Sequence, residues 1–264
     1  MNIFYRELRS NFKSLLIWCG ISFLFITIGF AKFSAYYENP ELLAILDSMP
    51  PAILAAFHMD AFNLTTISGF FGVMFAYFGL LLSISAVMWG SDIISKEERD
   101  KTVEFALTLP VTRGKIITAK TAAAVVYSIV LALITWGADL INATPYEPNS
   151  DFYDFLALSM LALFLMQMIF LAVGIFIGSV MKNHKRSGST AVAILLGTYF
   201  ISIVYGLYEK LDFLKYFSPF TYFNPAVMLQ EGKIEITYVW LSAGIVAVSL
   251  IGAYIAYSKR DLYI

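Results

Sequence analysis

Few residues in this chain have side chains that commonly bind metals or act as nucleophiles. It has two histidines, His58 and His184, and one cysteine, Cys19, among 264 residues. An intramembrane metalloprotease or a di-metal enzyme needs several ligands on facing helices, which two histidines in separate loops do not supply. A single cysteine forms neither an intramolecular disulfide nor a cysteine metal site. The sequence therefore predicts no metal site.

The carboxylates and hydroxyls do not form an evident catalytic set either. The adjacent pair Glu97–Glu98 lies within the charged run Lys96–Lys101, which is typical of a solvated helix face rather than of a catalytic dyad. Serines in apolar segments usually bond to the preceding helical turn or let helices approach closely. Those without a candidate base nearby in the sequence are Ser83, Ser85 and Ser128. We therefore expect no catalytic residues.

A nucleotide site is also missing from the sequence. The tetrapeptide Arg113–Ile116 contains a Gly-Lys pair. A phosphate-binding loop also needs an upstream glycine and a Ser or Thr directly after the lysine, and neither is present. We expect this chain to bind no cofactor and not to hydrolyse ATP by such a loop of its own.

Two polar residues lie inside apolar segments. Asp139 is the clearest acidic residue there, and Gln167 is polar but uncharged. Ion channels and ion carriers depend on charges within the bilayer, and this chain has almost none. Two interpretations of Asp139 stay open: a rim carboxylate that reaches outer water, or a group that relays protons or cations.

Composition places these residues in an integral membrane protein. Hydrophobic residues make up 59% of the chain and charged residues 14%, against about 45–50% and about 25% in soluble domains. The net charge of −1 gives no reason to expect a nucleic-acid partner. We predict a single all-α, polytopic domain over residues 1–264, with six apolar segments long enough to span a bilayer as helices. The predicted spans are 15–31, 67–90, 116–141, 155–181, 190–208 and 238–257.

Basic residues in the loops predict the orientation. Fourteen of the 18 Lys and Arg residues lie before residue 15, in 91–120, in 182–189 or after residue 257; the other four are Lys32, Lys210, Lys215 and Lys233. Because Lys and Arg are enriched in cytoplasmic loops, both termini should be cytoplasmic. We expect a multi-pass protein of the cell (plasma) membrane.

Three segments at the membrane surfaces do not span. The outer segment 38–63, which contains Pro40, Pro50 and Pro51, predicts a short helix packed on the outer rim. In residues 1–14, Phe4, Leu8 and Phe12 recur every four positions among basic residues, which predicts an interfacial amphipathic helix rather than a polar tail. The aromatic stretch within residues 209–235 is broken by Pro219 and Pro225. It predicts short re-entrant helices or an interfacial belt at the outer side, between spans five and six.

The most informative stretch follows the second span. It covers residues 91–115. Its charged start extends the second span, and Val103, Ala106 and Leu107 then form a short apolar stripe at helical spacing. Pro110 ends that helix, and Thr112 is placed to cap the next one. Without a partner this would be a plain basic loop; its mixed character favours docking into something soluble.

This stretch resembles the permease subunits of type 2 ATP-binding-cassette (ABC) transporters, as does the order of elements along the whole chain. Their loop has a Glu, a Thr-Leu-Glu, apolar residues, a proline, a basic residue and a Lys. The matching positions here are Glu97 or Glu98, Thr102, Val103, Glu104, Phe105, Leu107, Pro110, Arg113 and Lys120. One departure is Lys101, where many relatives have Gly before the Thr.

The resemblance implies a permease that forms half of an exporter. Residues 91–115 would then be its coupling segment, and we use that name for them from here on. It predicts contacts with separate ABC ATPase subunits, two copies in all, which bind ATP and Mg. The residues that would receive the ATPase are Glu97, Glu98, Arg99, Thr102, Val103, Glu104, Ala106, Leu107, Pro110 and Arg113. A second permease, identical or paralogous, would dimerise through spans one, two and five, where the small residues are Gly69, Gly72, Gly79 and Gly197.

Two other function classes remain to be distinguished from a permease. A membrane scaffold or sensor subunit would bind an ATPase or kinase without forming a path. An intramembrane enzyme is disfavoured by the missing ligands and nucleophile. The sequence does not name the transported substrate, an accessory subunit or a role for Asp139 in transport.

Overall fold

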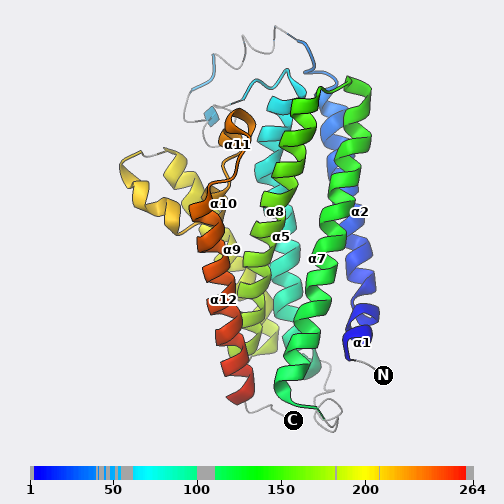
Figure 1. The fold of residues 1–264 in the computed structure, drawn as a ribbon, viewed down its shortest axis with the longest axis vertical. Coiled ribbons are helices and arrows are strands. Elements are labelled where there is room, and N and C mark those ends of the chain that lie inside the picture. Colours follow the sequence, from blue (N-terminus) through cyan, green and yellow to red (C-terminus); the bar gives the residue numbers. More distant parts are fainter. Residues whose placement is uncertain are drawn as a thin grey trace.

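The six-helix architecture predicted from the sequence is confirmed. The computed structural model describes residues 3–39, 41, 45, 48–50, 53–54, 62–99, 111–181, 183–207 and 209–259. Within these residues every regular element is a helix, and six helices are long and apolar enough to cross a membrane. They stand side by side as an upright bundle (Figure 1).

The helices extend the predicted spans by a few residues at most ends. The six long helices are α2 (Phe12–Phe33), α5 (Ile67–Arg99), α7 (Arg113–Ala143), α8 (Ser150–Val180), α9 (His184–Leu207) and α12 (Ile236–Lys259). The shorter ones are α1 (Ile3–Ser10), η1 (Thr144–Tyr146), η2 (Glu209–Tyr216), α10 (Pro219–Tyr222) and α11 (Pro225–Glu231).

Polar residues close to the helix starts set several of these boundaries. The side chain of Thr112 accepts a hydrogen bond from the amide of Lys115 (3.3 Å), so the predicted cap of α7 is confirmed. Asn149 does the same for α8 by accepting from the amide of Phe152 at 3.0 Å. Gly232, in the left-handed conformation at φ 62°, ends α11.

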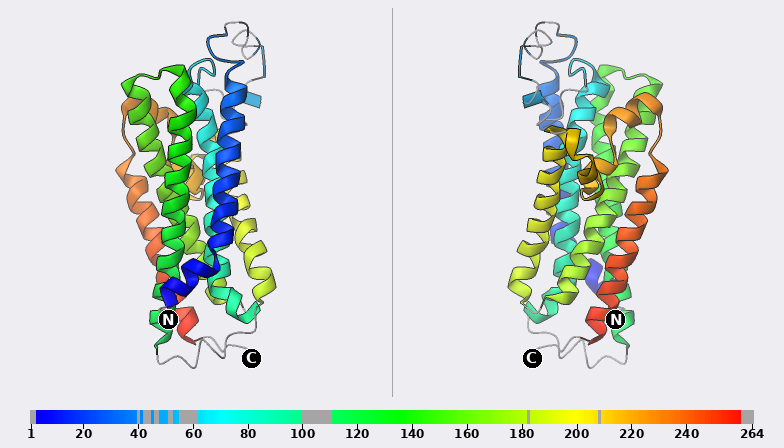
Figure 2. Two further views of the ribbon diagram at one scale, coloured as in Figure 1. Left: turned by 90° about the vertical axis from the view of Figure 1, so that its right-hand side faces the viewer. Right: turned by 90° about the vertical axis from the view of Figure 1, so that its left-hand side faces the viewer.

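The bundle has two unlike ends. The short helix α1, the end of α5, the start of α7 and the end of α12 lie together at one end, which we call the basic end. Figure 2 shows α1, in dark blue, lying obliquely across this end below α2. The connections η1, η2, α10 and α11 lie toward the opposite end (Figures 1 and 2).

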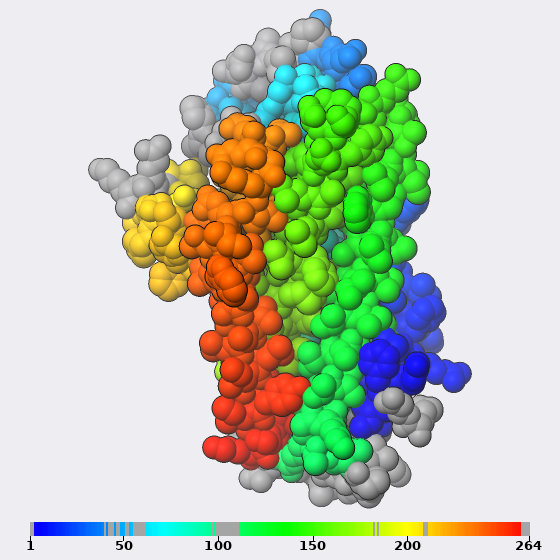
Figure 3. Space-filling view, in the orientation of Figure 1, coloured from blue at the N-terminus to red at the C-terminus, as the bar shows by residue number. Residues whose placement is uncertain are grey.

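Helices α5 and α8 form the centre of the bundle. Two thirds of the residues in the apolar core of each are buried (67%), against 22% in α2 and 17% in each of α9 and α12. The last three helices therefore present most of their apolar surface outward, to lipid or to another protein. Figure 3 shows α12 meeting α7 at the basic end, with α8 visible between them farther up.

Three glycines allow α5 and α8 to approach closely. A Cβ on Gly90 of α5 would overlap the carbonyl oxygen of Leu171, and one on Gly174 of α8 would overlap that of Val87. One turn farther on, a Cβ on Gly178 would lie 2.7 Å from the carbonyl oxygen of Ser91. Small residues four apart bring helix backbones together in membranes, where the hydrophobic effect does not drive association.

The other helices pack by mixed contacts, α2 mainly against α7 and α12 mainly against α8. Ser22 of α2 and Thr135 of α7 share a buried hydrogen bond of 2.8 Å. The ring of Phe176 on α8 fills the space at Gly252 of α12, where a Cβ would meet it at 2.7 Å.

The short helices between α9 and α12 lie deep along the bundle. The ring of Phe220 on α10 packs between Phe170 of α8 and Tyr199 of α9, at centroid distances of 5.3 and 5.2 Å. Phe170 is the twenty-first residue of α8, which is about 30 Å along a helix that rises 1.5 Å per residue. The segment thus turns back into the bundle, as a re-entrant pair of helices does.

Two sequence-based expectations need comment. The interfacial helix was expected over residues 1–14, whereas α1 ends at Ser10 and the spanning helix already begins at Phe12, whose side chain is exposed. The apolar stripe of the coupling segment, residues 103–107, lies outside the described residues, so its helix stays a prediction.

We predict that Gly174→Ala will destabilise the protein. The added methyl group overlaps a backbone oxygen that cannot rotate away, so the helices must separate at a cost of about 1–3 kcal/mol. Gly137→Ala in α7 is the matched control, because no atom lies within 4 Å of its Cβ position. Thermal unfolding in detergent should show a lower midpoint for Gly174→Ala alone; equal midpoints would contradict the close approach.

Candidate functional site

The predicted coupling residues lie at the end of α5, at the start of α7 and between them. We call the end of α5 and the start of α7 together the frame. Glu97, Glu98 and Arg99 form the last three positions of α5, and Arg113 is the first residue of α7. The side chain of Glu98 is half-buried. The remaining predicted coupling residues, Thr102, Val103, Glu104, Ala106, Leu107 and Pro110, lie outside the described residues, so their role stays a prediction.

A buried carboxylate joins both sides of this frame to α1. Glu7 of α1 is completely buried. It pairs with Lys96 in the last turns of α5, and its other oxygen lies 3.7 Å from the ammonium of Lys120 in α7. Arg6 approaches the same carboxylate from the surface at 3.4 Å. We call Glu7, Lys96 and Lys120 the ion cluster.

The lysines of the ion cluster also bond to neighbouring helices. Lys120 is completely buried and donates to the carbonyl oxygen of Ile93 in α5 at 2.5 Å. Lys96 is 6% exposed and donates to the hydroxyl of Ser10 at 3.3 Å. Burying an ammonium group is costly unless it is paired and hydrogen-bonded, and both lysines meet that condition.

Two aromatic residues hold α1 and the start of α2 against the frame. The hydroxyl of Tyr127 on α7 donates to the carbonyls of Glu7 (3.1 Å) and Leu8, at the end of α1. The indole of Trp89 on α5 donates to the hydroxyl of Ser14 on α2 at 2.9 Å. The two rings contact each other with centroids 5.5 Å apart. The chain entering α2 is therefore fixed to both α5 and α7.

The start of α7 is held on its other side by α12. Arg113 donates to the carbonyl oxygens of Tyr257 (3.3 Å) and Ser258 (3.2 Å), in the last turn of α12. A cation is favourable there, because the carbonyls at a helix C-terminus lack helical partners and carry partial negative charge. The hydroxyls of Thr118 and Tyr254 share a further hydrogen bond of 2.7 Å. Both sides of α7 are thus braced where the coupling segment ends.

The sequence analysis missed Glu7 as a site residue, although its position carries a signal. Phe4 and Leu8 mark the apolar side of α1, and Glu7 lies next to Leu8 and one turn after Phe4. It is the acidic residue on the face that packs against the bundle, among Arg6 and Arg9. A charge on the buried face of an amphipathic helix implies a buried partner.

A cavity of about 700 Å³ opens beside the ion cluster. It lies between α2, α5 and α9. Trp18, Trp89 and Leu196 form part of its apolar wall, while Asp92 and Lys185 bring charge to its lining. Its volume is in the range of small-molecule sites, which run from about 300 to 1,000 Å³. The combination of indole rings with charged groups suits an amphipathic molecule.

The four glycines predicted for a dimer interface occupy different surroundings. Cβ atoms on Gly69 and Gly72 would overlap Asn63 and Phe62 of the same chain, and one on Gly79 would lie 3.3 Å from the sulfur of Met166. Gly197 on α9 has no atom within 4 Å of its Cβ position. Their role in a dimer stays a prediction; of the four, Gly197 has the open face that a second copy requires.

Asp139 does not reach water in this chain. Its side chain is completely buried, and neither carboxylate oxygen has a hydrogen-bond partner among the described residues. Gln167 is likewise buried, and its two polar side-chain atoms have no hydrogen-bond partner in the described part of the chain. The interpretation of Asp139 as a rim carboxylate is therefore wrong, and a relay role stays untested. Within the part of the chain that the structure describes, no three His, Cys, Asp or Glu residues gather as metal ligands.

Comparison with protein families finds one match that spans nearly the whole chain. The family described as "ABC-2 family transporter protein" matches residues 1–262. No curated protein matches the sequence.

We predict that Glu7→Gln will destabilise the basic end, because it leaves Lys96 and Lys120 buried without their common anion. Removing one partner of a buried ion pair costs roughly 3–5 kcal/mol. Adding Lys96→Met to Glu7→Gln should restore part of the lost stability, since it removes one of the two buried ammonium groups that have no anion. Glu147→Gln, at an exposed site of the opposite end, is the control. Unfolding midpoints of the unchanged protein, the two single variants Glu7→Gln and Lys96→Met, the double variant and the control test this. Strictly additive losses for Glu7→Gln and Lys96→Met would rule out the pairing.

Proposed function

We propose that this chain, which belongs to the ABC-2 family of transporter proteins, is the permease subunit of an ATP-driven exporter. A transport permease role follows from the family match over residues 1–262. The finer steps, namely export, coupling to an ATPase and the identity of the driving nucleotide, are our inference. The observation that supports them is the ion cluster, which joins α1 to α5 and to α7, the two helices on either side of the coupling segment. We call this set of contacts the brace.

An energy source outside this chain fits the sequence. Since no phosphate-binding loop is evident, ATP and Mg²⁺ would be bound by separate ABC ATPase subunits, two per transporter. Their closure would press on residues 97–109. A movement of this kind is transmitted only if the receiving segment is attached to rigid elements. Helices α5 and α7, fixed to each other through Lys120 and Ile93, provide that attachment.

Contacts between the helices would transmit a displacement of the coupling segment to the rest of the bundle. Helix α5 is locked to α8 at Gly90 and Gly174, and α7 is bonded to α12 through Arg113. A displacement of the coupling segment would therefore move α5, α7, α8 and α12 together, with α1 following through Glu7. Helix α9 would be moved relative to them.

The cavity between α2, α5 and α9 is the proposed start of the substrate path. The cavity is bounded by α2 and α9, which present most of their apolar surface outward, and by α5. In our proposal, α5 is the helix that ATPase closure displaces. A second permease copy, identical or paralogous, placed against spans one, two and five would enclose it. The mixed lining favours a large apolar or amphipathic cargo over a bare ion, in agreement with spans that carry almost no charge.

The proposed arrangement puts the basic end in the cytoplasm. The loop before α9 and the start of α7 then face the ATPase, and the re-entrant segment faces outward. The protein would lie in the cell membrane with both termini inside. A scaffold that only binds an ATPase would share this topology, but it would show no substrate-stimulated ATP turnover after reconstitution.

We predict that Leu107→Asp will release the ATPase while leaving the spans inserted. Burying an aliphatic side chain stabilises a contact by roughly 1.5–3 kcal/mol, so a charge there should weaken docking at least about tenfold. Glu104→Lys should lower transport more than it lowers membrane abundance, by reversing a charge at the rim of the contact. ATPase copurification and transport at matched expression measure both effects.

Val111→Asp is the control for this experiment. Val111 is exposed and lies beyond Pro110, outside the apolar stripe. It should retain the ATPase. Full activity and normal copurification of Leu107→Asp would show that this segment is not the coupling helix.

The orientation gives a separate prediction. In a chain with Cys19→Ser, a cysteine at Arg186 should resist an impermeant thiol reagent in intact cells, whereas one at Ser150 should react. Both positions are exposed in the structure, so access from the medium decides the result. Labelling of Arg186→Cys as strong as that of Ser150→Cys would reverse the orientation.

A further inference from the structure

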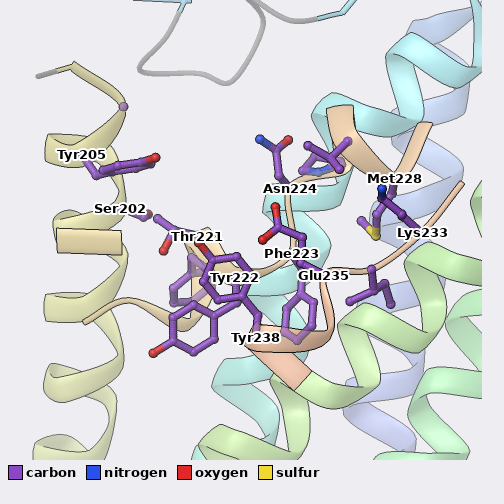
Figure 4. Close-up of a pocket in the computed structure, with 15 residues that line it drawn as sticks. Ser202, Tyr205, Thr221, Tyr222, Phe223, Asn224, Met228, Lys233, Glu235 and Tyr238 are labelled. Carbon is purple, nitrogen blue, oxygen red and sulfur yellow. The ribbon is translucent and has the colours of Figure 1, made fainter. Parts of the chain in front are cut away.

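A second cavity, of about 210 Å³, lies between α9, the re-entrant helices and the start of α12. Tyrosines from three different elements line it: Tyr205 of α9, Tyr222 of α10 and Tyr238 of α12. The rings of Tyr222 and Tyr238 are stacked, with centroids 5.3 Å apart and planes within 9° of parallel. Figure 4 shows Tyr205 directed from α9 toward this group, with Glu235 also among the lining residues.

The charges around this cavity sum to a negative value among the described residues. Glu235 lines the cavity and forms no ion pair there with another described residue. Lys233 is the cation of the lining, but it pairs with Glu231 at 2.7 Å, and this bond raises the pKa of Lys233 above its ordinary value. Lys215, whose charge acts on Tyr238, pairs with Asp212 at 2.7 Å. Lys233 and Lys215 are thus each paired with a carboxylate outside the lining, and Glu235 remains as the excess negative charge. A carboxylate at the start of α12 also suits the helix dipole, so charge alone does not define a ligand.

The aromatic lining and the volume of the cavity limit which ligands it can bind. An organic ammonium ion is attracted to the faces of tyrosine rings, and aromatic cages are the usual sites for quaternary ammonium groups. An apolar cavity of about 150 Å³ already holds a benzene molecule, so 210 Å³ admits a compact ion of several heavy atoms. It is smaller than the roughly 300–1,000 Å³ of drug-sized sites. The cavity is therefore distinct in scale from the proposed substrate path.

We propose that this cavity binds a small quaternary ammonium group, with Tyr205 and the outer side of the stacked Tyr222–Tyr238 pair against its methyl groups and Glu235 as the counter-ion. The group belongs either to a free ammonium compound or to the choline headgroup of a lipid. In both cases the ligand joins three elements that otherwise meet mainly through ring contacts: the end of α9, α10 and the start of α12. It is then a site that holds the outer end of the bundle together.

The proposal does not depend on the exporter function, because the test uses binding to the purified chain. The full-length protein is placed in phosphatidylglycerol nanodiscs, and choline binding is measured by isothermal titration calorimetry. The matched probe is 3,3-dimethyl-1-butanol, which has the shape of choline but a carbon in place of the nitrogen. Choline should bind saturably and at least about tenfold more tightly than this neutral isostere.

Substitutions locate the binding in the cavity. Glu235→Gln and Tyr238→Leu should each weaken choline binding at least about fivefold, whereas Tyr238→Phe, which keeps the ring face, should bind nearly as well as the unchanged protein. Glu147→Gln, an exposed carboxylate on the connection before α8, is the control and should have no effect. Absence of saturable binding, equal binding of the isostere, or full binding by Glu235→Gln would each overturn the proposal.

Repeating the titration in phosphatidylcholine nanodiscs identifies the source of the group. If lipid headgroups occupy the cavity, choline must displace them and its apparent affinity falls relative to that in phosphatidylglycerol. If the affinity is the same in both lipids, the ligand is a free ammonium compound. The site itself is supported in either case by the charge-dependent binding in phosphatidylglycerol.

Discussion

Gly90 on α5 and Gly174 on α8 face each other so closely that neither position has room for a Cβ. In a bilayer the lipid tails are as apolar as the side chains, so helices associate through close packing rather than through the removal of water. The two helices brought together here are also the most deeply buried in the bundle. Helices α7, α9 and α12 pack around them, while α2 packs mainly against α7. The part of α5 beyond the contact inherits its rigidity from α8.

That rigidity matters because α5 leads into the coupling segment. Gly178 continues the close contact at Ser91, where the extension of α5 beyond its apolar part begins. Five residues later Lys96 enters the ion cluster with Glu7 and Lys120. An ion pair buried this completely adds little net stability over well-packed apolar residues, but it is directional and is costly to leave half-formed. It therefore fixes where α1 lies relative to α5 and α7.

The sequence predicts the spans well and the contacts between them poorly, for a physical reason. Hydropathy reports how long a helix must be to cross the bilayer, and it located all six helices to within several residues. It does not report which face of a lipid-compatible helix meets a neighbour, because that face is as apolar as the others. Gly174 and Gly178 are four residues apart, but Gly20, Gly114 and Gly137 have nothing near their Cβ positions. Only the packing distinguishes the two kinds of glycine. Glu7 was more accessible to prediction, since its place on the apolar face of α1 is visible in the sequence.

The two ends of the molecule differ in what joins their helices. At the basic end, helices are tied by the ion cluster, by Arg113 on the carbonyls of α12, and by hydrogen bonds of Tyr127 and Trp89. Beyond the basic end, α9 and α12 are connected through short helices that turn back into the bundle and meet it by ring contacts such as that of Phe220. Aromatic contacts have weaker orientational preferences than buried, hydrogen-bonded ion pairs, so they restrain the relative position of two helices less. The contacts at the basic end therefore restrain the positions of α5, α7 and α12 more strongly than the ring contacts restrain the junction of α9, α10 and α12. The opening and closing of a path through this protein should be sought at that junction.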